Sequence, residues 1–413
     1  MHDLHFLFLQ GLPTPFFSRV AQELSSLGSK VTGINLCIGD ALFWRGENTV
    51  NYRGRLSDWP NYIANFLEEN QVTDIVLLGE QRSYHQDAIE AAKAREIRVT
   101  VTDFGYLRPD WITLEADGMG GNSRFPKDPA TILELASLAP IVTIEKQYAD
   151  SFWTMAVGDI SYHLCNFFFW WLFPHYIRPY KRDNPFLHYL CIGRRLFFTK
   201  LGHKKATQRL VELRSENIKY FLFPLQLAND FQIIAYSHFN SLVEAMEVVI
   251  QSFAENVNSD TRLIIKVHPL DPGIKNYEKL IATLSAKYGI KKRIDYFDGG
   301  DLDDIITGAE GIITVNSTVG IRALQLGRPV MTLGDAIYDV AGLTYQGHID
   351  QYWKNTEQPD TTLVDAFINA IADTIQIRGV FYSEPGLTAA VTEAVDRLYQ
   401  GTVGGVCRKA IAQ

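Results

Sequence analysis

The sequence lacks the short motifs that mark the commonest nucleotide and metal sites. Its 413 residues contain neither a G-x-G-x-x-G dinucleotide loop nor a G-x-x-x-x-G-K-[ST] phosphate loop, which disfavours NAD and ATP as ligands. The four cysteines are scattered, with no C-x-x-C pair and no His/Cys spacing typical of zinc. We therefore expect neither NAD or ATP as a cofactor nor a Cys/His zinc site, no disulfide framework, and a reducing compartment.

An excess of positive charge and a long apolar run are also missing. The net charge of −8 argues against a mainly electrostatic grip on nucleic acid, so no nucleic-acid partner is expected. The most apolar run, NFFFWWLFP at 166–174, is far shorter than the ~20 residues that span a bilayer. The N-terminus, MHDLHFLFLQGLP, has no basic segment before its apolar residues, so it predicts a first strand and not a signal peptide. A cytoplasmic location follows.

What is present is the composition of a soluble globular protein, with 46% hydrophobic and 21% charged residues. A chain of this length favours two domains. In the first part, strands predicted at LHFLFLQ, KVTGINL, DIVLLGE and RVTVTDFG alternate with helices at FFSRVAQELSSLG, NYIANFLEEN and YHQDAIEAAKARE. Such alternation predicts a parallel sheet with helices on both faces.

The alternation stops after residue 145 and resumes near residue 216. From there, predicted strands YFLFPL, RLIIKVHP, RIDYFD, GIITVNS and PVMTLG alternate with helices, and two more helices close the chain. The predicted fold is α/β, with two Rossmann-like doubly wound domains facing a cleft in the GT-B manner and a helical insertion between them. The expected ranges are 1–145, an insertion at 146–215, a second domain at 216–385 and a C-terminal helix at 386–413 that packs back.

The insertion contains the run NFFFWWLFP, which we interpret first as a buried helix. The alternative is a patch that rests on a membrane or accepts lipid, since basic residues lie nearby. These are Arg178, Lys181, Arg182, Arg194 and Arg195.

Two strand ends in the second domain carry residues suited to a phosphate. In GIITVNSTVG, the polar residues Asn316, Ser317 and Thr318 precede a helix with Gly320 in its first turn. Free backbone N–H groups there would suit an anion, although Asn, Ser and Thr are also ordinary helix caps. In RLIIKVHP, Lys266 and His268 lie two residues apart and project to the same side of the strand. A structural role for His268 is the competing interpretation.

In a third segment, FPLQLANDFQ, the end of the strand is followed by Gln226, Asp230 and Gln232. Asp230 either caps the next helix or takes part in chemistry. The first domain offers similar candidates after three of its strands, and each of them alone is typical of surface loops as well. We consider them acceptor-side candidates: Gly11, Glu80, Arg82, His85, Asp103, Tyr106 and Arg108.

Taken together, these segments resemble the bacterial capsule-polysaccharide β-Kdo transferases, which are retaining enzymes that transfer Kdo from CMP-Kdo. The resemblance runs in order from near residue 5 to about residue 335. It rests on LQGLPTPFFSRVAQEL, INLCIGDALFW with YRG and WP, LLGEQRSYHQDAIEAA, FGYLRPDWITLE, GNSRFPKDP, FPLQLANDFQI, KVHP and NSTVGIRALQLGRPV. The chain also looks like the Kdo-transferring module of lipopolysaccharide O-antigen synthases, where such a unit can be one part of a larger polypeptide with further glycosyltransferase domains.

The resemblance implies a two-Rossmann fold, CMP-Kdo as donor, no catalytic metal, and a role for several residues. Asp230 matches the acidic position proposed as nucleophile, and Lys266, His268 and Pro269 match the HP motif near the CMP phosphate. Ser317 and Thr318 match the phosphate-binding helix start. With Gln226, Gln232, Asn316 and Gly320 they form the expected donor site. The family usually has two acidic residues before GY(F)LR, whereas this chain has Asp103 followed by Phe104; Asp103 inherits the acceptor-activating role.

The expected function is therefore retaining Kdo transfer to a sugar on a growing or lipid-linked bacterial surface polysaccharide, at the inner face of the inner membrane. Retention by two displacements requires a carboxylate opposite the leaving phosphate. Two alternatives stay open. One is a two-Rossmann transferase or epimerase that uses a UDP- or GDP-sugar. The other is a non-catalytic polysaccharide-binding module of an assembly complex.

Overall fold

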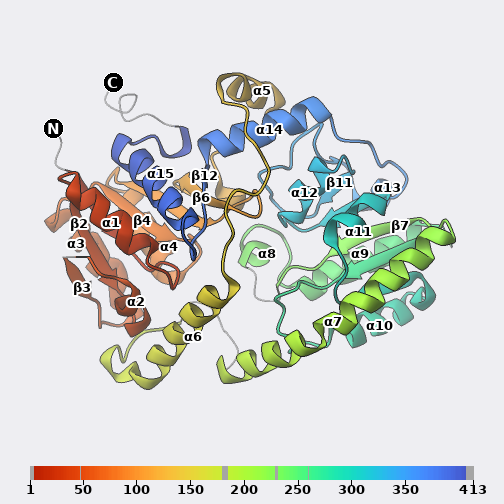
Figure 1. Ribbon diagram of the computed structural model, residues 1–413, viewed down its shortest axis with the longest axis horizontal. Helices are drawn as coiled ribbons and strands as arrows, with labels where there is room; N and C mark the ends of the chain where they lie inside the picture. The colour runs from red at the N-terminus through yellow and green to blue at the C-terminus, as the bar shows by residue number, and fades with distance from the viewer. Residues whose placement is uncertain (1–3, 47, 179–184, 228–230, 259, 406–413) are drawn as a thin grey trace. The chain divides into compact units, whose positions relative to one another are not determined.

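A computed structural model of the chain describes residues 4–46, 48–178, 185–227, 231–258 and 260–405, with backbone alone at 185–188, 196–200 and 231–232. Its internal contacts divide the chain into two compact units, each of which is described by itself. Unit 1 comprises Met1–Phe125, Ala139–Lys181 and Ile368–Gln413, and unit 2 comprises Pro126–Leu138 and Arg182–Phe367. Figure 1 shows the elements of both.

Unit 1 is built on one seven-stranded sheet, which we call sheet A. Its strands, in chain order, are β1 (His5–Phe8), β2 (Lys30–Asn35), β3 (Thr49–Asn51), β4 (Asp74–Leu78), β5 (Arg98–Phe104), β6 (Trp111–Ala116) and β12 (Gln376–Arg378). They lie in the order β12-β6-β5-β4-β1-β2-β3. The five strands from β5 to β3 are parallel, whereas β6 runs antiparallel to both of its neighbours.

Helices cover both faces of sheet A. The helices of unit 1 are α1 (Phe16–Ser26), α2 (Ile38–Phe43), α3 (Trp59–Glu69), α4 (Ser83–Lys93), α6 (Phe152–Phe168) and α15 (Gly386–Gln400), with short 3₁₀ turns η1 (Leu56–Asp58), η2 (Gly120–Asn122), η3 (Trp170–Leu172) and η5 (Val403–Gly405). Side chains alternate along β1, so Phe6 and Phe8 pack with α1 and α15, while Leu7 packs with α3 and α4 on the other face.

Unit 2 is built on a five-stranded parallel sheet, sheet B, in the order β11-β10-β7-β8-β9. Its strands are β7 (Tyr220–Pro224), β8 (Arg262–Lys266), β9 (Ile294–Phe297), β10 (Gly311–Thr314) and β11 (Val330–Thr332). All five residues of β7 are buried, as expected for a central strand that is covered on both faces.

The helices of unit 2 again lie on both faces of the sheet. They are α5 (Pro129–Leu138), α7 (Pro185–Ser215), α8 (Phe231–Ala235), α9 (Leu242–Asn256), α10 (Tyr277–Lys287), α11 (Leu302–Gly308), α12 (Val319–Gln325) and α13 (Ile349–Tyr352), with the turn η4 (Lys291–Arg293); α14 (Thr361–Thr374) leads from unit 2 into unit 1. Phe221 and Phe223 pack with α9 and α10. Leu222 and Ile312 point the other way, toward α11 and α12.

The predicted α/β class with two Rossmann-like domains is confirmed, and every strand and helix predicted for the two sheets is found. Three details differ from the expectation. Sheet A is mixed and not purely parallel, because β6 runs antiparallel to β5 and β12. The sequence analysis did not recognise β6 or β12. The chain also divides differently from the predicted ranges. Residues from Ile368 onward belong to unit 1, since β12 joins sheet A and α15 packs beside α1. The expected insertion is divided between the units, with α6 in unit 1 and the whole of α7 in unit 2.

The third difference concerns NFFFWWLFP. The prediction that this run is a buried helix is wrong, because the helix ends at Phe168 and the large side chains from Phe167 to Trp171 are exposed. Among the described residues, no helix combines the length and the apolar character that crossing a membrane requires.

Candidate functional site

The carboxyl edge of sheet B brings the predicted donor-side residues together. β7 lies between β8 and β10, and all three strands are parallel. The segments that leave Pro224, Lys266 and Thr314 therefore emerge at the same edge, which is where ligands bind in open α/β sheets. The predicted residues on these segments are Gln226, Lys266, His268, Pro269, Asn316, Ser317 and Thr318.

Gln226 and Asn316 are bonded to each other across this edge. The Gln226 Nε2 donates to Asn316 Oδ1 at 2.9 Å, and the backbone N–H of Asn316 donates to Gln226 Oε1 at 3.4 Å. Gln226 is buried. The pair thus holds together the ends of β7 and β10.

Lys266 is a buried cation at the end of β8, only 6% exposed. Burial lowers the pKa of its ammonium group, while the nearby Asp298 opposes that shift. Arg195, from α7, donates to Asp298 Oδ1 at 2.5 Å and ion-pairs with Asp271 at 3.4 Å. Two cations and two carboxylates therefore lie together at this edge. The sequence analysis did not assign Arg195, Asp271 or Asp298 to this site.

His268 follows two residues after Lys266 and is half-buried. Its Nδ1 accepts a hydrogen bond from the backbone N–H of Leu270 at 3.1 Å. This bond requires an unprotonated Nδ1, so the neutral ring carries its proton on Nε2. His268 is therefore positioned as a donor through Nε2. Pro269 is exposed beside it.

The start of α12 differs from the expected anion site. Three backbone N–H groups that were expected to be free are already bonded: Ser317 to Thr314 Oγ1 at 3.1 Å, Val319 to Ser317 Oγ at 3.3 Å, and Gly320 to the Ser317 carbonyl at 2.9 Å. Ser317 thus forms a local turn through its hydroxyl oxygen, whereas Thr318 at the N-cap makes no side-chain capping bond. The predicted role of this helix start in binding phosphate stays a prediction. Thr318 is the residue from which the helix begins.

Packing requires a glycine at position 320. A Cβ at this position would come within 2.4 Å of the Tyr338 hydroxyl oxygen. That hydroxyl donates to the Ser317 carbonyl at 2.6 Å, so the small residue lets Tyr338 fix the turn before α12.

Two donor-side residues cannot be placed. Asp230, the predicted nucleophile, lies outside the described residues. Gln232 belongs to α8, but its side chain is not described. Their predicted roles therefore stay predictions.

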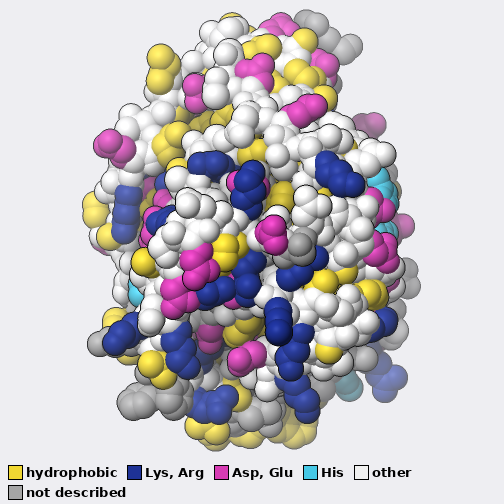
Figure 2. Space-filling model, turned by 90° about the vertical axis from the view of Figure 1, so that its right-hand side faces the viewer, with side chains coloured by type: hydrophobic (Ala, Val, Ile, Leu, Met, Phe, Trp, Pro, Cys, Tyr) yellow, Lys and Arg dark blue, Asp and Glu magenta, His cyan; other side chains and the backbone are white. Residues whose placement is uncertain are grey.

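Lys and Arg side chains gather on one face of the molecule in spite of the net charge. Figure 2 shows them over the lower half of the face that is turned to the right in Figure 1. Along α7, the exposed cations include Arg194, Lys204 and Lys205.

The carboxyl edge of sheet A collects the predicted acceptor-side residues, because β1, β4 and β5 are neighbours and parallel. Asp103 is half-buried at the end of β5, where its Oδ1 accepts the backbone N–H of Phe104 at 2.7 Å. Its Oδ2 lies 3.8 Å from the point that a Cβ would occupy at Gly79. The carboxylate therefore lies beside the end of β4. Arg108 is exposed, with its guanidinium 5.5 Å from the centroid of the Phe104 ring.

Glu80, His85 and Tyr106 are buried, and the described contacts give them supporting roles. Both oxygens of Glu80 accept hydrogen bonds from the loop after β6: Oε2 from Met119 N–H at 3.1 Å and Oε1 from the Asn122 amide at 2.7 Å. His85 bonds the Gly79 carbonyl through Nδ1 at 2.8 Å, and burial lowers the pKa of its imidazole to about 3. It is therefore neutral.

Tyr106 connects the same loop to a carboxyl group that the sequence analysis missed, Glu115. The Tyr106 hydroxyl donates to Glu115 Oε1 at 2.6 Å and accepts the Gly120 N–H at 2.7 Å. Burial raises the pKa of Glu115 to about 8. The signal was available in WITLEA, where Glu115 alternates with apolar residues along a strand, but that strand was not predicted.

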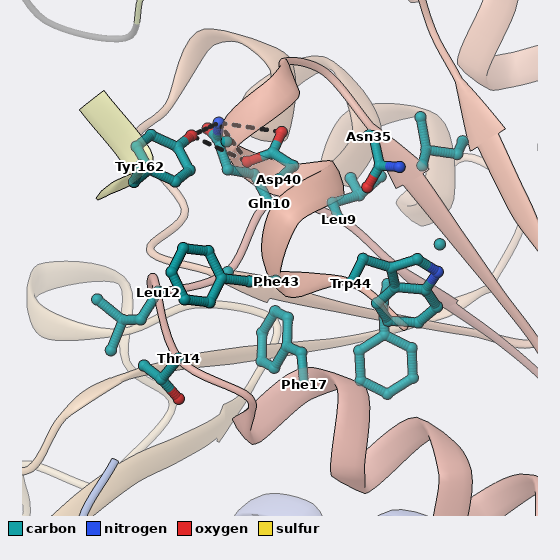
Figure 3. A pocket seen from close by; sticks show the side chains of 15 residues that line it. Leu9, Gln10, Leu12, Thr14, Phe17, Asn35, Asp40, Phe43, Trp44 and Tyr162 are labelled. Atoms are coloured by element: carbon teal, nitrogen blue, oxygen red, sulfur yellow. Dashed lines mark hydrogen bonds between the residues drawn. The ribbon is translucent and has the colours of Figure 1, made fainter. Parts of the chain in front are cut away.

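Arg82 is hydrogen-bonded to a second cluster of polar side chains that the sequence analysis missed. This cluster lies at the ends of β1 and β2. Its Nη1 donates to Gln10 Oε1 at 2.9 Å, and the Gln10 amide donates to Asp40 at 3.0 Å and contacts the Tyr162 hydroxyl at 2.7 Å. Burial raises the pKa of Asp40. Figure 3 shows Gln10, Asp40 and Tyr162 beside a pocket with aromatic walls. The pocket is lined by Gly11, Leu12, Phe17, Phe43 and Trp44, among others.

The family model described as "capsule polysaccharide biosynthesis protein" matches residues 73–382. The chain belongs to this family. It is 32% identical over 387 residues to the capsule polysaccharide export protein KpsS of Escherichia coli, an alignment that covers 91% of this chain and 96% of that protein. It is 29% identical over 402 residues to the capsule polysaccharide modification protein LipB of Neisseria meningitidis serogroup A, which covers 92% of this chain and 91% of LipB.

Among solved structures, the chain aligns with the beta Kdo 2,7 transferase of Thermosulfurimonas dismutans KpsC. The identity is 15% and the TM-score 0.45, with 95% of this chain and 99% of that chain covered.

Proposed function

We propose that this capsule-biosynthesis protein is a retaining glycosyltransferase that moves Kdo from CMP-Kdo to a sugar acceptor. The observation that carries the proposal is the buried Lys266 at the carboxyl end of β8, followed by His268 and lying at the same sheet edge as Gln226 and Asn316. A cation and a neutral donor at such an edge suit the phosphate of a nucleotide sugar.

In the first step, the Asp230 carboxylate attacks the anomeric carbon of Kdo. A bond forms between the carboxylate oxygen and that carbon, while the bond to the CMP phosphate oxygen breaks and its electron pair leaves with CMP. Lys266 and His268 offset the charge that grows on the phosphate. Because attack comes from the face opposite the phosphate, the configuration is inverted once.

In the second step, the acceptor hydroxyl attacks the same carbon and the bond to Asp230 breaks, which restores its carboxylate. The hydroxyl proton passes to Asp103, which acts as the general base. The second inversion gives net retention. No metal takes part in this proposal, because Lys266 and His268 supply the positive charge and the hydrogen bond that the leaving phosphate needs.

The proposed acceptor is a sugar on a growing or lipid-linked bacterial surface polysaccharide, reached from the cytoplasmic side of the inner membrane. The family description and the capsule-related names of two relatives support this class of acceptor. Further glycosyltransferase domains on the same polypeptide would be partners in such a pathway.

A non-catalytic role is the second candidate, because the relative from Escherichia coli is named an export protein. A polysaccharide-binding module would need neither a buried lysine at a strand end nor a histidine fixed as a donor beside it. Release of CMP from CMP-Kdo by the purified chain would exclude this role.

The donor is tested by thermal unfolding in the presence of CMP, UDP and GDP, since a ligand of the native state raises its stability. We expect CMP to raise the melting temperature most, and Lys266→Met to remove most of that rise. Lys275→Met is the matched control, because Lys275 is exposed on the loop after β8. A rise with UDP or GDP and none with CMP would contradict the proposed donor and favour the UDP- or GDP-sugar alternative.

A further inference from the structure

Helix α6 of unit 1 packs on its neighbours with a face made of small and polar residues. Gly158, Tyr162 and Asn166 are spaced by four residues and so lie on one side of the helix. The Asn166 side chain accepts the Gly39 N–H at 2.9 Å, and the Tyr162 hydroxyl donates to Asp40 at 2.9 Å. A Cβ at Gly158 would lie 2.5 Å from the Pro13 carbonyl oxygen, so the helix approaches the backbone closely.

The opposite side of α6 is apolar and faces outward. At 100° per residue, Trp153, Val157, Ile160 and Phe168 lie between about 120° and 180° from the centre of the packed face. Trp153 is 76% exposed, Val157 62% and Phe168 61%. A surface helix of a globular protein normally buries its apolar side, so α6 has the reverse arrangement.

The apolar side continues into η3, directly after α6. Trp170 is 63% exposed and Trp171 59%. We call the whole set the α6–η3 surface; its members are Trp153, Val157, Ile160, Phe167, Phe168, Phe169, Trp170 and Trp171. Large contiguous apolar patches on soluble proteins mark sites of association, so this surface has a partner.

At the η3 end of the α6–η3 surface, the charges are positive. No Asp or Glu occurs from Ile160 to Arg178, and Asp159 just before it pairs with His163 at 3.5 Å. A hollow of about 450 Å³, its open mouth included, is lined by aromatic residues and Arg178. At its edge, the Arg53 guanidinium lies 5.8 Å from the centroid of the Phe173 ring. The margin of the surface is therefore suited to anions.

We propose that the α6–η3 surface docks on an anionic lipid bilayer. Trp and Phe side chains favour the boundary between headgroups and acyl chains, and cations beside them are attracted to anionic lipid. A second copy of the chain fits less well. A two-fold interface brings the same surface to itself, and Arg178 and Arg53 would then face a surface that offers no carboxylate between Ile160 and Arg178.

This docking uses none of the residues proposed for catalysis, so it can be tested without any activity. The full chain is sedimented with vesicles of phosphatidylcholine alone and of phosphatidylcholine mixed equally with phosphatidylglycerol. We expect binding to the mixed vesicles, and a loss of about tenfold or more in the partition constant for the double variant W170S/W171S, since two interfacial aromatic anchors are removed. The variant R178Q should lose affinity for the mixed vesicles only.

The matched control is Ile141→Ser. Ile141 is also in unit 1 and 93% exposed, but it lies outside the α6–η3 surface, so this variant should bind as the unchanged chain does. Circular dichroism and the melting temperature check that W170S/W171S is folded. If that variant does not fold, quenching of tryptophan fluorescence in the unchanged chain by brominated lipid replaces it, with quenching expected in mixed vesicles.

Three results would overturn the proposal. The first is no binding to mixed vesicles, or no quenching. The second is binding that W170S/W171S leaves unchanged. The third is a dimer, seen by analytical ultracentrifugation, that this double variant converts to a monomer, because a second copy would then be the partner of the surface.

Discussion

The carboxyl edges of the two sheets have the same backbone design and different chemistry. At the edge of sheet A, the carboxyl groups include Glu80 and Asp103. At the edge of sheet B, an amide pair lies beside the buried ammonium of Lys266, and Arg195 pairs there with Asp271 and Asp298. Parallel strands with helices on both faces leave the strand ends open in either case. The difference between the two edges therefore lies in a few side chains. Under the proposed function, the edge of sheet A accepts the proton and the edge of sheet B binds the phosphate.

The largest expected effect separates the two edges directly. Asp103→Asn should lower the rate of Kdo transfer by about 10²–10⁴-fold, because the general base is lost. Binding of CMP, measured by thermal shift, should be unchanged. The rate of transfer is measured with an acceptor glycan and the release of CMP without one. An equal loss in both assays would show that Asp103 acts on the donor and not on the acceptor.

The complementary change is made at sheet B. Lys266→Met keeps the length and apolar stem of the side chain and removes its charge, so the proposed stabilisation of the leaving phosphate is lost. We expect about a 10²–10³-fold loss in kcat/KM, together with weaker CMP binding, in contrast to Asp103→Asn. Lys275→Met should be active, and a Lys266→Met variant with full activity would contradict the assignment of this edge.

A smaller effect concerns stability at sheet A. Burial raises the pKa of Glu115 from 4.5 to about 8 in the native state, so the native protein holds a proton that the unfolded chain releases between these values. The free energy of unfolding should therefore fall as the pH rises through this window, by at most about 1.4 kcal/mol per pH unit from this group.

The measurement is urea denaturation across that window for the unchanged chain and for Glu115→Gln, which keeps the shape and cannot ionise. The variant should show a flatter dependence on pH. Glu134→Gln, at an exposed position of α5, is the control. Parallel curves for Glu115→Gln and the unchanged chain would mean that the pKa of Glu115 is not raised in the native state.

The smallest effect concerns the amide pair of sheet B. Gln226→Leu removes the two hydrogen bonds between Gln226 and Asn316, so we expect a loss of about 1–3 kcal/mol in the free energy of unfolding. The double variant with Asn316→Leu should lose less than the sum of the two single changes. Strict additivity would show that the hydrogen bond contributes nothing.

Much of the fold could be predicted from the sequence, because buried parallel strands are continuous apolar runs that the pattern of DIVLL or YFLFP displays directly. What could not be predicted depends on partners distant in the chain. β12 is only three residues long, and it is a strand because Gln376 to Arg378 pair with Thr113 to Trp111. No local pattern reveals that pairing, and for this reason the C-terminal part was assigned to the wrong unit.

The candidate site could be predicted by position but not by contact. The strand ends that carry Gln226, Lys266 and Asn316 were recognised, since polar residues directly after apolar strands are visible in the sequence. Their pairing was not, nor was Arg195, which reaches Asp298 from a helix about one hundred residues earlier. The reversed faces of α6 were also hidden, because a helix with one apolar side is normally assumed to bury it.

The most direct test of the account is whether Asp230 becomes covalently attached to Kdo. CMP-Kdo is added, without acceptor, to the unchanged chain and to Asp103→Asn, which should slow the second step, and intact and peptide masses are measured. We predict one added Kdo on the peptide that contains Asp230, more of it in Asp103→Asn, and none in Asp230→Asn. Transfer with net retention but with no Kdo adduct in any of these samples would contradict the double displacement.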